Sequence, residues 1–260
     1  MIHLIWSANR HLYTGELLAN HRERQRQFVI ERGWGLRTID GGEYDDYDDE
    51  HALHLVGFSS QGEVEVGCRL RPTALGGVLP DVFPHLVDKS EWPIVRPGTF
   101  ECTRYFTAAQ NRGTRGFEAR SKLHISMLEL MQDLGGDRLL GFVDLGLLTH
   151  LRRFSGLQIR PVGLPTAYED GGTAIAFEIG VTPADVETAR TRLAIPTRQL
   201  FIAPSWLPAK ADVLSLAQTT KVLLSAPERR RRQLQRLARI AARDIVFQPD
   251  VERLKATMAG

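Results

Sequence analysis

The sequence predicts one α/β (α+β) domain in which helices and strands mix around a single sheet. Short segments of alternating or continuous apolar character are typical of strands. Amphipathic stretches of helical length separate several of them. No internal repeat is present in the 260 residues, so consecutive strands are expected to form one antiparallel or mixed sheet with helices packed on it.

The N-terminal region predicts a short strand over residues 2–6 and a helix over 15–32. Arg24 and Phe28 are one turn apart and share a face of that helix. Gly33 ends the helix and leaves Trp34 on the following loop. The usual interpretation of these residues is a solvated arginine beside core aromatics, and the sharper one is a ligand site. The acidic run 43–50 is either a solvated loop or a cation site.

A hairpin follows, with strands over residues 52–58 and 63–71. Side chains alternate along the second strand, which places Arg69 on its polar face, toward solvent or a binding cleft. A short turn or helix over 81–87 carries Phe83.

The strand predicted over residues 100–106 is apolar on both faces but contains Glu101 and Arg104. In a regular strand these two side chains, three positions apart, would point to opposite faces. They share one pocket only if a bulge or twist intervenes. The plainer interpretation is that each forms a structural ion pair.

The loop 110–116, with two glycines and two arginines, leads into a helix that ends at Gly135. A helix N-terminus after such a loop suits a phosphate group, although similar loops are common in proteins without that function. The remaining pattern predicts strands over 138–144, 158–162 and 174–179 and helices over 147–154 and 184–193.

Composition indicates an ordinary globular protein, with 43% hydrophobic and 25% charged residues. No apolar run approaches the length of about 20 residues that a membrane span needs, and residues 1–12 are too polar for a secretory signal. We therefore expect a cytoplasmic protein. Cys68 and Cys102 lie in no metal-ligand motif, so we expect neither a disulfide nor a metal site, and both should be small core residues.

Charge divides the chain into two parts. From residue 201 onward there are 11 Lys and Arg against 5 Asp and Glu, whereas residues 1–200 are mildly acidic. We expect a main domain over 1–200 and a basic helical extension over 201–260. An arginine-rich helix within 227–243 would dock on its own domain or contact a carrier protein, nucleic acid or membrane surface; we expect no nucleic acid.

Nine residues of the first 106 resemble, in order and spacing, the acyl-homoserine-lactone synthase (autoinducer synthase) family. The resemblance includes an Arg-x-x-x-Phe helix, a loop tryptophan, an Asp-x-x-Asp pair and the segment 101–104. It covers about residues 1–195. The nine residues are Arg24, Phe28, Trp34, Asp45, Asp48, Arg69, Phe83, Glu101 and Arg104.

This resemblance implies a fold similar to the GCN5-related N-acetyltransferases, a three-layer sandwich whose central mixed sheet is splayed. It implies an acyltransferase that makes a quorum-sensing signal. S-adenosyl-L-methionine and an acyl thioester would be its substrates, with no further cofactor, and 5'-methylthioadenosine and an N-acyl-homoserine lactone its products.

The resemblance also suggests roles for individual residues. Glu101 would be the base for the substrate amine, directly or through water. Backbone N–H groups near Arg104 and Tyr105 would stabilise the oxyanion. The substrate-binding set would use carboxylates for the cationic portion, arginines for the carboxylate and aromatic rings for stacking. Alternatively, Asp48 and Arg69 would tie the N-terminal loop to the sheet. The set is Arg24, Phe28, Trp34, Asp45, Asp48, Arg69, Phe83 and Tyr105.

The sequence allows two interpretations of the acyl-pocket residues and two acyl donors. Met127, Phe142 and Leu147 would line the pocket, although core packing explains them equally well. The donor would be an acyl-CoA or an acyl-carrier protein. Segments 81–86 and 163–165 resemble the branch of the family that accepts branched or aryl acyl-CoAs. The alternative functions are another acyl-CoA N-acyltransferase and a non-catalytic binding protein that uses its basic tail.

Overall fold

The computed structural model describes residues 1–114, 116–168 and 172–203. The basic helix expected within 227–243 lies outside the described residues. Among the described residues, no helix has the length and apolar character needed to cross a membrane.

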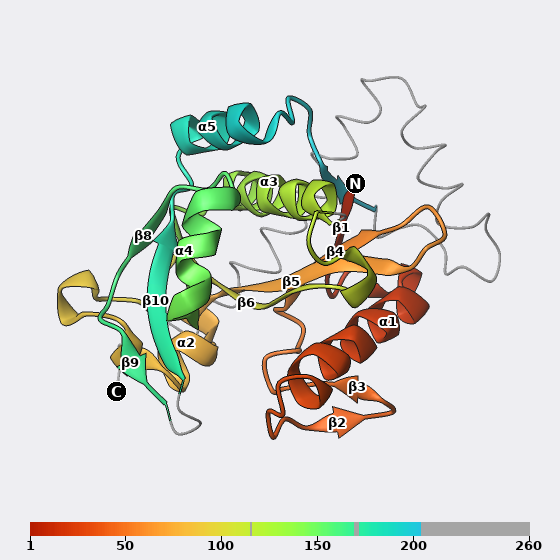
Figure 1. The fold of residues 1–260 in the computed structure, drawn as a ribbon, viewed down its shortest axis with the longest axis horizontal. Coiled ribbons are helices and arrows are strands. Elements are labelled where there is room, and N and C mark those ends of the chain that lie inside the picture. Colours follow the sequence, from red (N-terminus) through yellow and green to blue (C-terminus); the bar gives the residue numbers. More distant parts are fainter. Residues whose placement is uncertain (115, 169–171, 204–260) are drawn as a thin grey trace.

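The described residues contain a central mixed sheet of nine strands (Figure 1). Its order is β11-β1-β4-β5-β6-β7-β10-β8, and β9 pairs with β10. Most neighbours are antiparallel, but β6 pairs parallel with β7 and β1 pairs parallel with β11. The strands are β1 Ile2–Ile5, β4 Leu53–Phe58, β5 Val64–Pro72, β6 Thr99–Thr107, β7 Arg138–Asp144, β8 Ile159–Pro161, β9 Thr166–Ala167, β10 Thr173–Ile179 and β11 Leu200–Ile202; β2 Thr38–Ile39 and β3 Gly42–Glu43 form a separate ribbon.

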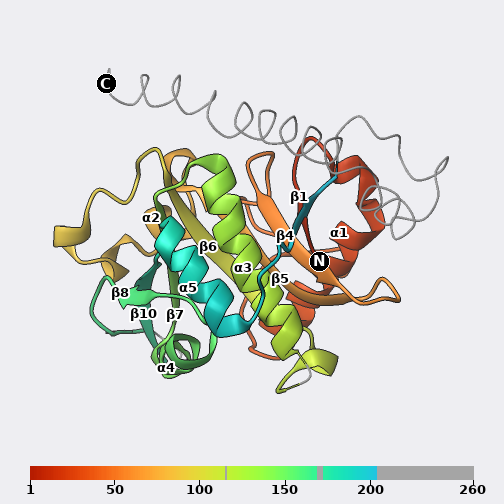
Figure 2. The same cartoon turned by 90° about the horizontal axis from the view of Figure 1, so that it is seen from above.

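Helices cover both faces of this sheet, which gives the three layers expected (Figures 1 and 2). The long helix α3 packs on β4 and β5 from one side and carries α5 on its outer surface, while α1 packs on β5 from the other side. The predicted fold class is therefore confirmed. The helices are α1 Thr14–Arg24, α2 Val78–Asp81, α3 Phe117–Leu134, α4 Leu145–Phe154 and α5 Pro183–Leu193, and a π-helical segment Gln25–Ile30 continues α1.

Local sequence signals explain where several elements begin and end. Thr182 and Asp185 form a reciprocal capping box at the start of α5. Gly135 adopts a left-handed conformation, with φ 66°, and ends α3. β7 occupies residues 138–144, as the pattern predicted.

A bulge in β6 decides how the central strand presents its side chains. Arg69 of β5 pairs with Thr103, but Gly67 pairs with Phe106, so β6 contains one extra residue between these pairs. Arg104 has a left-handed backbone, with φ 53°. Its side chain therefore leaves the normal alternation and joins the face that carries Glu101. The bulge that a shared pocket requires is therefore present, although only Arg104 of the two residues lines the cavity described below.

The sheet opens between β6 and β7. These parallel strands pair only from Thr99–Arg138 to Cys102–Gly141. Beyond that point β6 continues to Thr107 and β7 to Asp144, but the two strands no longer pair with each other. The result is a splayed centre, in which the end of each strand borders a gap rather than its neighbour.

The last described strand, β11, connects helix α3 with the first strand of the sheet. Glu129 of α3 is buried and accepts backbone hydrogen bonds from Gln199 and Leu200, at the start of β11. β11 then pairs with β1. The division into 1–200 and 201–260 stays a prediction, and β11 crosses residue 200.

Candidate active site

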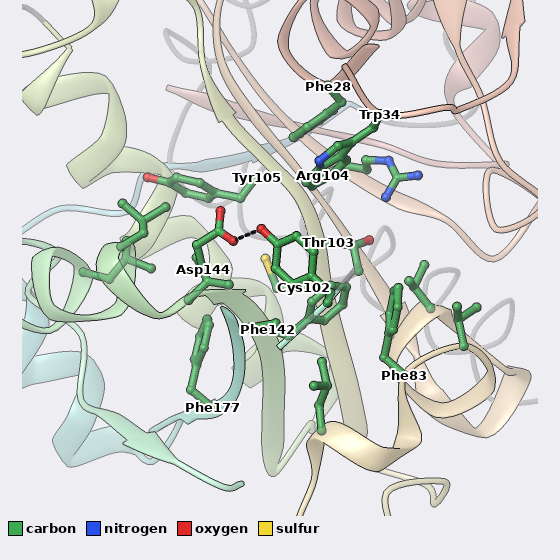
Figure 3. A pocket seen from close by; sticks show the side chains of 18 of the residues that line it. Phe28, Trp34, Phe83, Cys102, Thr103, Arg104, Tyr105, Phe142, Asp144 and Phe177 are labelled. Carbon is green, nitrogen blue, oxygen red and sulfur yellow. Dashed lines mark hydrogen bonds between the residues drawn. The ribbon is translucent and has the colours of Figure 1, made fainter. Parts of the chain in front are cut away.

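A cavity of about 540 Å³ lies where β6 and β7 separate. One wall comes from residues 102–105 of β6 and the other from residues 142–144 of β7 (Figure 3). Phe28 and Trp34 lie at one end of the cavity (Figure 3), and side chains of α3 and α4 also line it. The opening of the sheet thus produces a cavity bordered by strand ends from both halves.

The three residues expected in an acyl pocket all line this cavity, together with Phe83. Phe142 packs against Phe83, with ring centroids 5.3 Å apart, in a cluster that belongs to the α2 side of β7. Met127 belongs to the main core cluster under α3, and Leu147 lies on α4. The apolar lining therefore surrounds the end of β7 instead of forming one wall.

An aromatic pair forms the N-terminal end of the cavity. Phe28 and Trp34 stack with centroids 5.4 Å apart and planes 13° from parallel. The guanidinium of Arg32 lies over both rings, and that of Arg104 lies over Phe28. Sequence reasoning missed Arg32, which lies in the turn after the π-helical segment. In the helix predicted over 15–32 its spacing of four residues from Phe28 would have placed both on one face.

Arg24, Asp48 and Arg69 form a buried ion network behind this aromatic end. Arg24 donates two hydrogen bonds of 2.7 Å to the Asp48 carboxylate. Arg69 is fully buried and pairs with Asp48 at 2.8 Å and with Asp45. Because these carboxylates cover it, Arg69 faces neither solvent nor the cavity, which corrects both expected environments.

Glu43 completes the network and was missed in the sequence, where it is the first residue of an acidic run. It is fully buried and accepts hydrogen bonds from Arg24 at 2.6 Å and from Arg104 at 2.9 Å. Arg104 also pairs with Asp45 at 2.8 Å. Three guanidinium groups thus balance three carboxylates.

The network changes what Asp45 and Asp48 are able to bind. Burial alone would raise the pKa of Asp48, but the hydrogen-bonded guanidinium of Arg24 and the charge of Arg69 lower that pKa well below its usual range. Asp48 does not line the cavity, whereas Asp45 does. Both carboxylates are already neutralised by arginine, so a substrate cation would have to compete with an ion pair at either one.

The Glu101 carboxylate lies behind the cavity wall. It is fully buried and accepts hydrogen bonds from the backbone N–H groups of Val78, at 2.9 Å, and Leu79, at 2.8 Å. Burial raises its pKa, more than these two hydrogen bonds lower it. Gly77 permits this approach, because a Cβ there would lie 2.6 Å from the carboxylate. Val78 lines the cavity but Glu101 does not. Its role as the base stays a prediction, in which water would carry the proton.

Tyr105 and His124 form a hydrogen-bonded pair on the α3 side of the cavity. The Nδ1 atom of His124 lies 2.9 Å from the Ser155 carbonyl oxygen, which only accepts, so Nδ1 carries the hydrogen. Nε2 must then accept from the Tyr105 hydroxyl, 2.9 Å away. Burial lowers the pKa of His124 to about 4, so its ring is neutral near pH 7. The Tyr105 oxygen therefore presents only lone pairs to any further partner.

His124→Gln is expected to reduce the acid sensitivity of the fold. A histidine kept neutral by burial contributes stability above its unfolded pKa near 6.5, and that stability is lost as pH falls toward 4. The full shift corresponds to about 3 kcal/mol. Glutamine can replace both hydrogen bonds but does not titrate. Melting temperatures measured from pH 7.5 to 5 should fall less steeply in the variant. Parallel curves for the two proteins would contradict the assignment.

The loop that was expected to bind phosphate is partly engaged by protein groups. Arg112 donates to the side chain of Gln27 at 2.7 Å and pairs with Glu31. Arg120 donates to the Gly113 carbonyl oxygen at 2.6 Å. Arg115 lies outside the described residues. A phosphate role for this loop stays a prediction.

His21, Asp48 and His54 each place a ligand atom within 4.8 Å of the others. Burial lowers the pKa of both histidines, that of His21 to about 4, so both are neutral. The Asp48 oxygens, however, already accept from Arg24 and Arg69. The geometry assigns this carboxylate to the ion network rather than to a metal ion.

Cys68 is buried in the main core, where burial raises the pKa of its thiol. Cys102 differs from the expectation of a core residue, because it is only half-buried and lines the cavity. Cys102 pairs with Gly141 in the last pair before the sheet opens, so its side chain borders the cavity.

Sequence comparison and structure comparison both find similarity to autoinducer synthases. The family model for autoinducer synthases matches residues 10–189. Isovaleryl-homoserine lactone synthase of Bradyrhizobium diazoefficiens is 32% identical over 201 residues, which cover 76% of this chain and 87% of that protein. An acyl-homoserine-lactone synthase of Ralstonia nicotianae is 30% identical over 187 residues, 70% of this chain and 88% of that protein.

Two solved structures share this fold at moderate sequence identity. The CoA-dependent acyl-homoserine lactone synthase BjaI, solved with SAM and isopentyl-CoA, superposes with a TM-score of 0.70 at 28% identity, over 85% of this chain and 99% of that one. The CoA-dependent synthase MesI superposes with a TM-score of 0.66 at 28% identity, over 77% and 98%.

Proposed function

The chain belongs to the autoinducer synthase family, and from this premise we infer that it is an acyl-homoserine-lactone synthase that uses S-adenosyl-L-methionine and an acyl-CoA. The observation that supports this function best is the cavity at the sheet opening. It joins an aromatic, cation-bearing end at Phe28, Trp34 and Arg104 to a mainly apolar remainder around Phe83 and Phe142. One end suits a nucleoside and the other an acyl chain.

The reaction proceeds in two steps. The amine of S-adenosyl-L-methionine, after losing a proton, attacks the thioester carbonyl, and the tetrahedral intermediate expels the CoA thiolate to leave an amide. The substrate carboxylate then attacks its own γ-carbon, which closes the lactone and expels the sulfonium as neutral 5'-methylthioadenosine. The protein contributes mainly by holding the amine and the carbonyl carbon close together. Backbone N–H groups of β6 beside the gap, near Arg104 and Tyr105, would stabilise the oxyanion.

We propose that the acyl group is short and branched. Two relatives at 28% identity are CoA-dependent, and the relative at 32% identity makes an isovaleryl product. The paired rings of Phe83 and Phe142 form a compact apolar surface at the end of β7. A pocket bounded by two rings packed on each other would favour a compact acyl group over a long flexible chain.

Mass spectrometry of the purified protein with S-adenosyl-L-methionine tests both statements. The panel should contain isovaleryl-CoA, linear acyl-CoAs of increasing length, an aryl-CoA and the same acyl groups on an acyl-carrier protein. We expect 5'-methylthioadenosine and an acyl-homoserine lactone, formed fastest from isovaleryl-CoA. Faster turnover of the carrier-protein form would reject the CoA donor. A folded protein that yields neither product from the panel would reject the function.

Trp34→Ala is expected to weaken binding of both S-adenosyl-L-methionine and 5'-methylthioadenosine by about tenfold or more. Stacking of a base on an aromatic ring is worth about 1–3 kcal/mol, and both molecules carry the adenine. Calorimetric titration measures the effect. Trp92→Ala is the matched control, because Trp92 is 46% exposed and does not line the cavity. Equal effects of the two substitutions would contradict a role for Trp34 in nucleoside binding.

A further inference from the structure

Asp144 occupies an unusual position at the end of β7. It is the N-cap residue of α4, where an aspartate normally accepts a hydrogen bond from the first turn of the helix. Here its side chain makes no such bond. It accepts a hydrogen bond from the Tyr168 hydroxyl instead, and both residues line the cavity. The dashed line in Figure 3 marks this contact among the cavity side chains.

Asp144 differs from the other carboxylate that lines the cavity in its ion pairing. Among the described residues that line it, the carboxylates are those of Asp45 and Asp144. Asp45 is paired with Arg69 and Arg104. Asp144 has no salt bridge to a described basic residue, and its hydrogen-bond donor is a neutral hydroxyl. Among the described residues, Asp144 is therefore the carboxylate in the cavity that is able to bind a cation without displacing an arginine.

The strand register places Asp144 at the reaction gap. The last paired residues of the parallel strands are Cys102 and Gly141. Asp144 follows Gly141 by three residues, as Tyr105 follows Cys102, so the two lie at comparable distances beyond the last pair, on opposite borders of the opening. The β6 border carries the bulge at Arg104. An anionic group thus faces the part of β6 where backbone groups are released from the sheet.

We propose that Asp144 binds the α-amino group of S-adenosyl-L-methionine, an inference that rests on the function proposed above. A carboxylate attracts an ammonium and accepts its N–H groups in charge-assisted hydrogen bonds. Tyr168 engages one oxygen, Oδ1, and fixes the orientation of the group while leaving Oδ2 available. Glu101 does not offer this contact, because both of its oxygens accept backbone N–H groups and the residue does not line the cavity. Asp144 would hold the nitrogen beside the gap until it loses its proton.

The test compares two ligands that differ in the amino-acid portion. S-adenosyl-L-methionine carries the α-amino group, whereas 5'-methylthioadenosine retains the nucleoside but lacks the amino-acid portion and its α-amino group. In calorimetric titrations, Asp144→Asn should weaken S-adenosyl-L-methionine binding by about tenfold or more, as expected for a lost hydrogen bond to a charged group. Binding of 5'-methylthioadenosine should stay within about twofold of the wild-type value.

Asp137→Asn is the matched control, because Asp137 immediately precedes β7 at its opposite end and pairs with Arg96 on the surface. It should bind both ligands as the wild type does. Tyr168→Phe, which keeps the carboxylate but removes its hydroxyl partner, should weaken S-adenosyl-L-methionine binding by less than Asp144→Asn. Asp144 is exposed to solvent, so its variant should fold, as circular dichroism would verify.

The pH dependence provides a readout that a structural role would not change. An α-amino group has a pKa of about 8, so the difference between wild type and Asp144→Asn should narrow as pH rises from 6.5 to 9. Equal losses for both ligands, or unchanged affinity for S-adenosyl-L-methionine, would overturn the proposal for Asp144 alone. If the wild-type protein bound neither ligand, the proposed function would fail and this inference with it.

Discussion

Asp48→Ala is expected to lower the free energy of unfolding by about 3–5 kcal/mol, the range found when one partner of a buried ion pair is removed. The side chain of Asp48 is 4% exposed and contacts two guanidinium groups, of which Arg24 is 1% exposed and Arg69 fully buried. Without Asp48, two buried cations would share the remaining carboxylates. In a domain of about 200 residues, the melting temperature should fall by about 10 °C.

Thermal unfolding followed by circular dichroism measures this effect. Asp46→Ala is the control, since Asp46 lies two residues away with a side chain that is 91% exposed and 3.6 Å from Arg37. Exposed pairs of this kind contribute little, so its melting temperature should equal that of the wild type. Equal melting temperatures for the Asp48 variant and the wild type would show that the network does not stabilise the fold.

Glu101→Gln is expected to reduce kcat by at least about 100-fold, the lower range for the loss of a general base. The amide would also place an NH₂ group against one of two backbone N–H donors, at Val78 or Leu79. That change would disturb α2 and the cavity wall that it forms. Both causes reduce turnover, so the rate by itself does not distinguish them.

The pH–rate profile separates the two causes. Burial raises the pKa of Glu101, so a base at this position gives a rate that rises with pH through that raised value. Glutamine should abolish the rise if Glu101 is the base. Gly77→Ala provides a second variant, because its Cβ would press on the carboxylate without removing it. If the rise persists in the glutamine variant and both variants lose turnover, Glu101 acts by positioning α2 and is not the base.

Much of the fold followed from local sequence signals. Periodicity and the glycine at 135 predicted α3, alternation predicted β5, and the pattern over 184–193 predicted α5. These signals depend on residues a few positions apart, so they can be recognised in the sequence. The order and spacing of nine residues also indicated the family, which the comparisons confirm.

The tertiary structure decided what the charged residues do. Glu43 pairs with Arg24 and Arg104, which are 19 and 61 residues away in the chain. Asp45 and Asp48 thereby become parts of a neutral network. Asp144, which no sequence pattern marked, lines the cavity and forms no salt bridge with a described basic residue. The sequence by itself determined the elements and the family, because both depend on local spacing. Only the folded chain determined which carboxylates are neutralised, because that depends on long-range pairing and on burial.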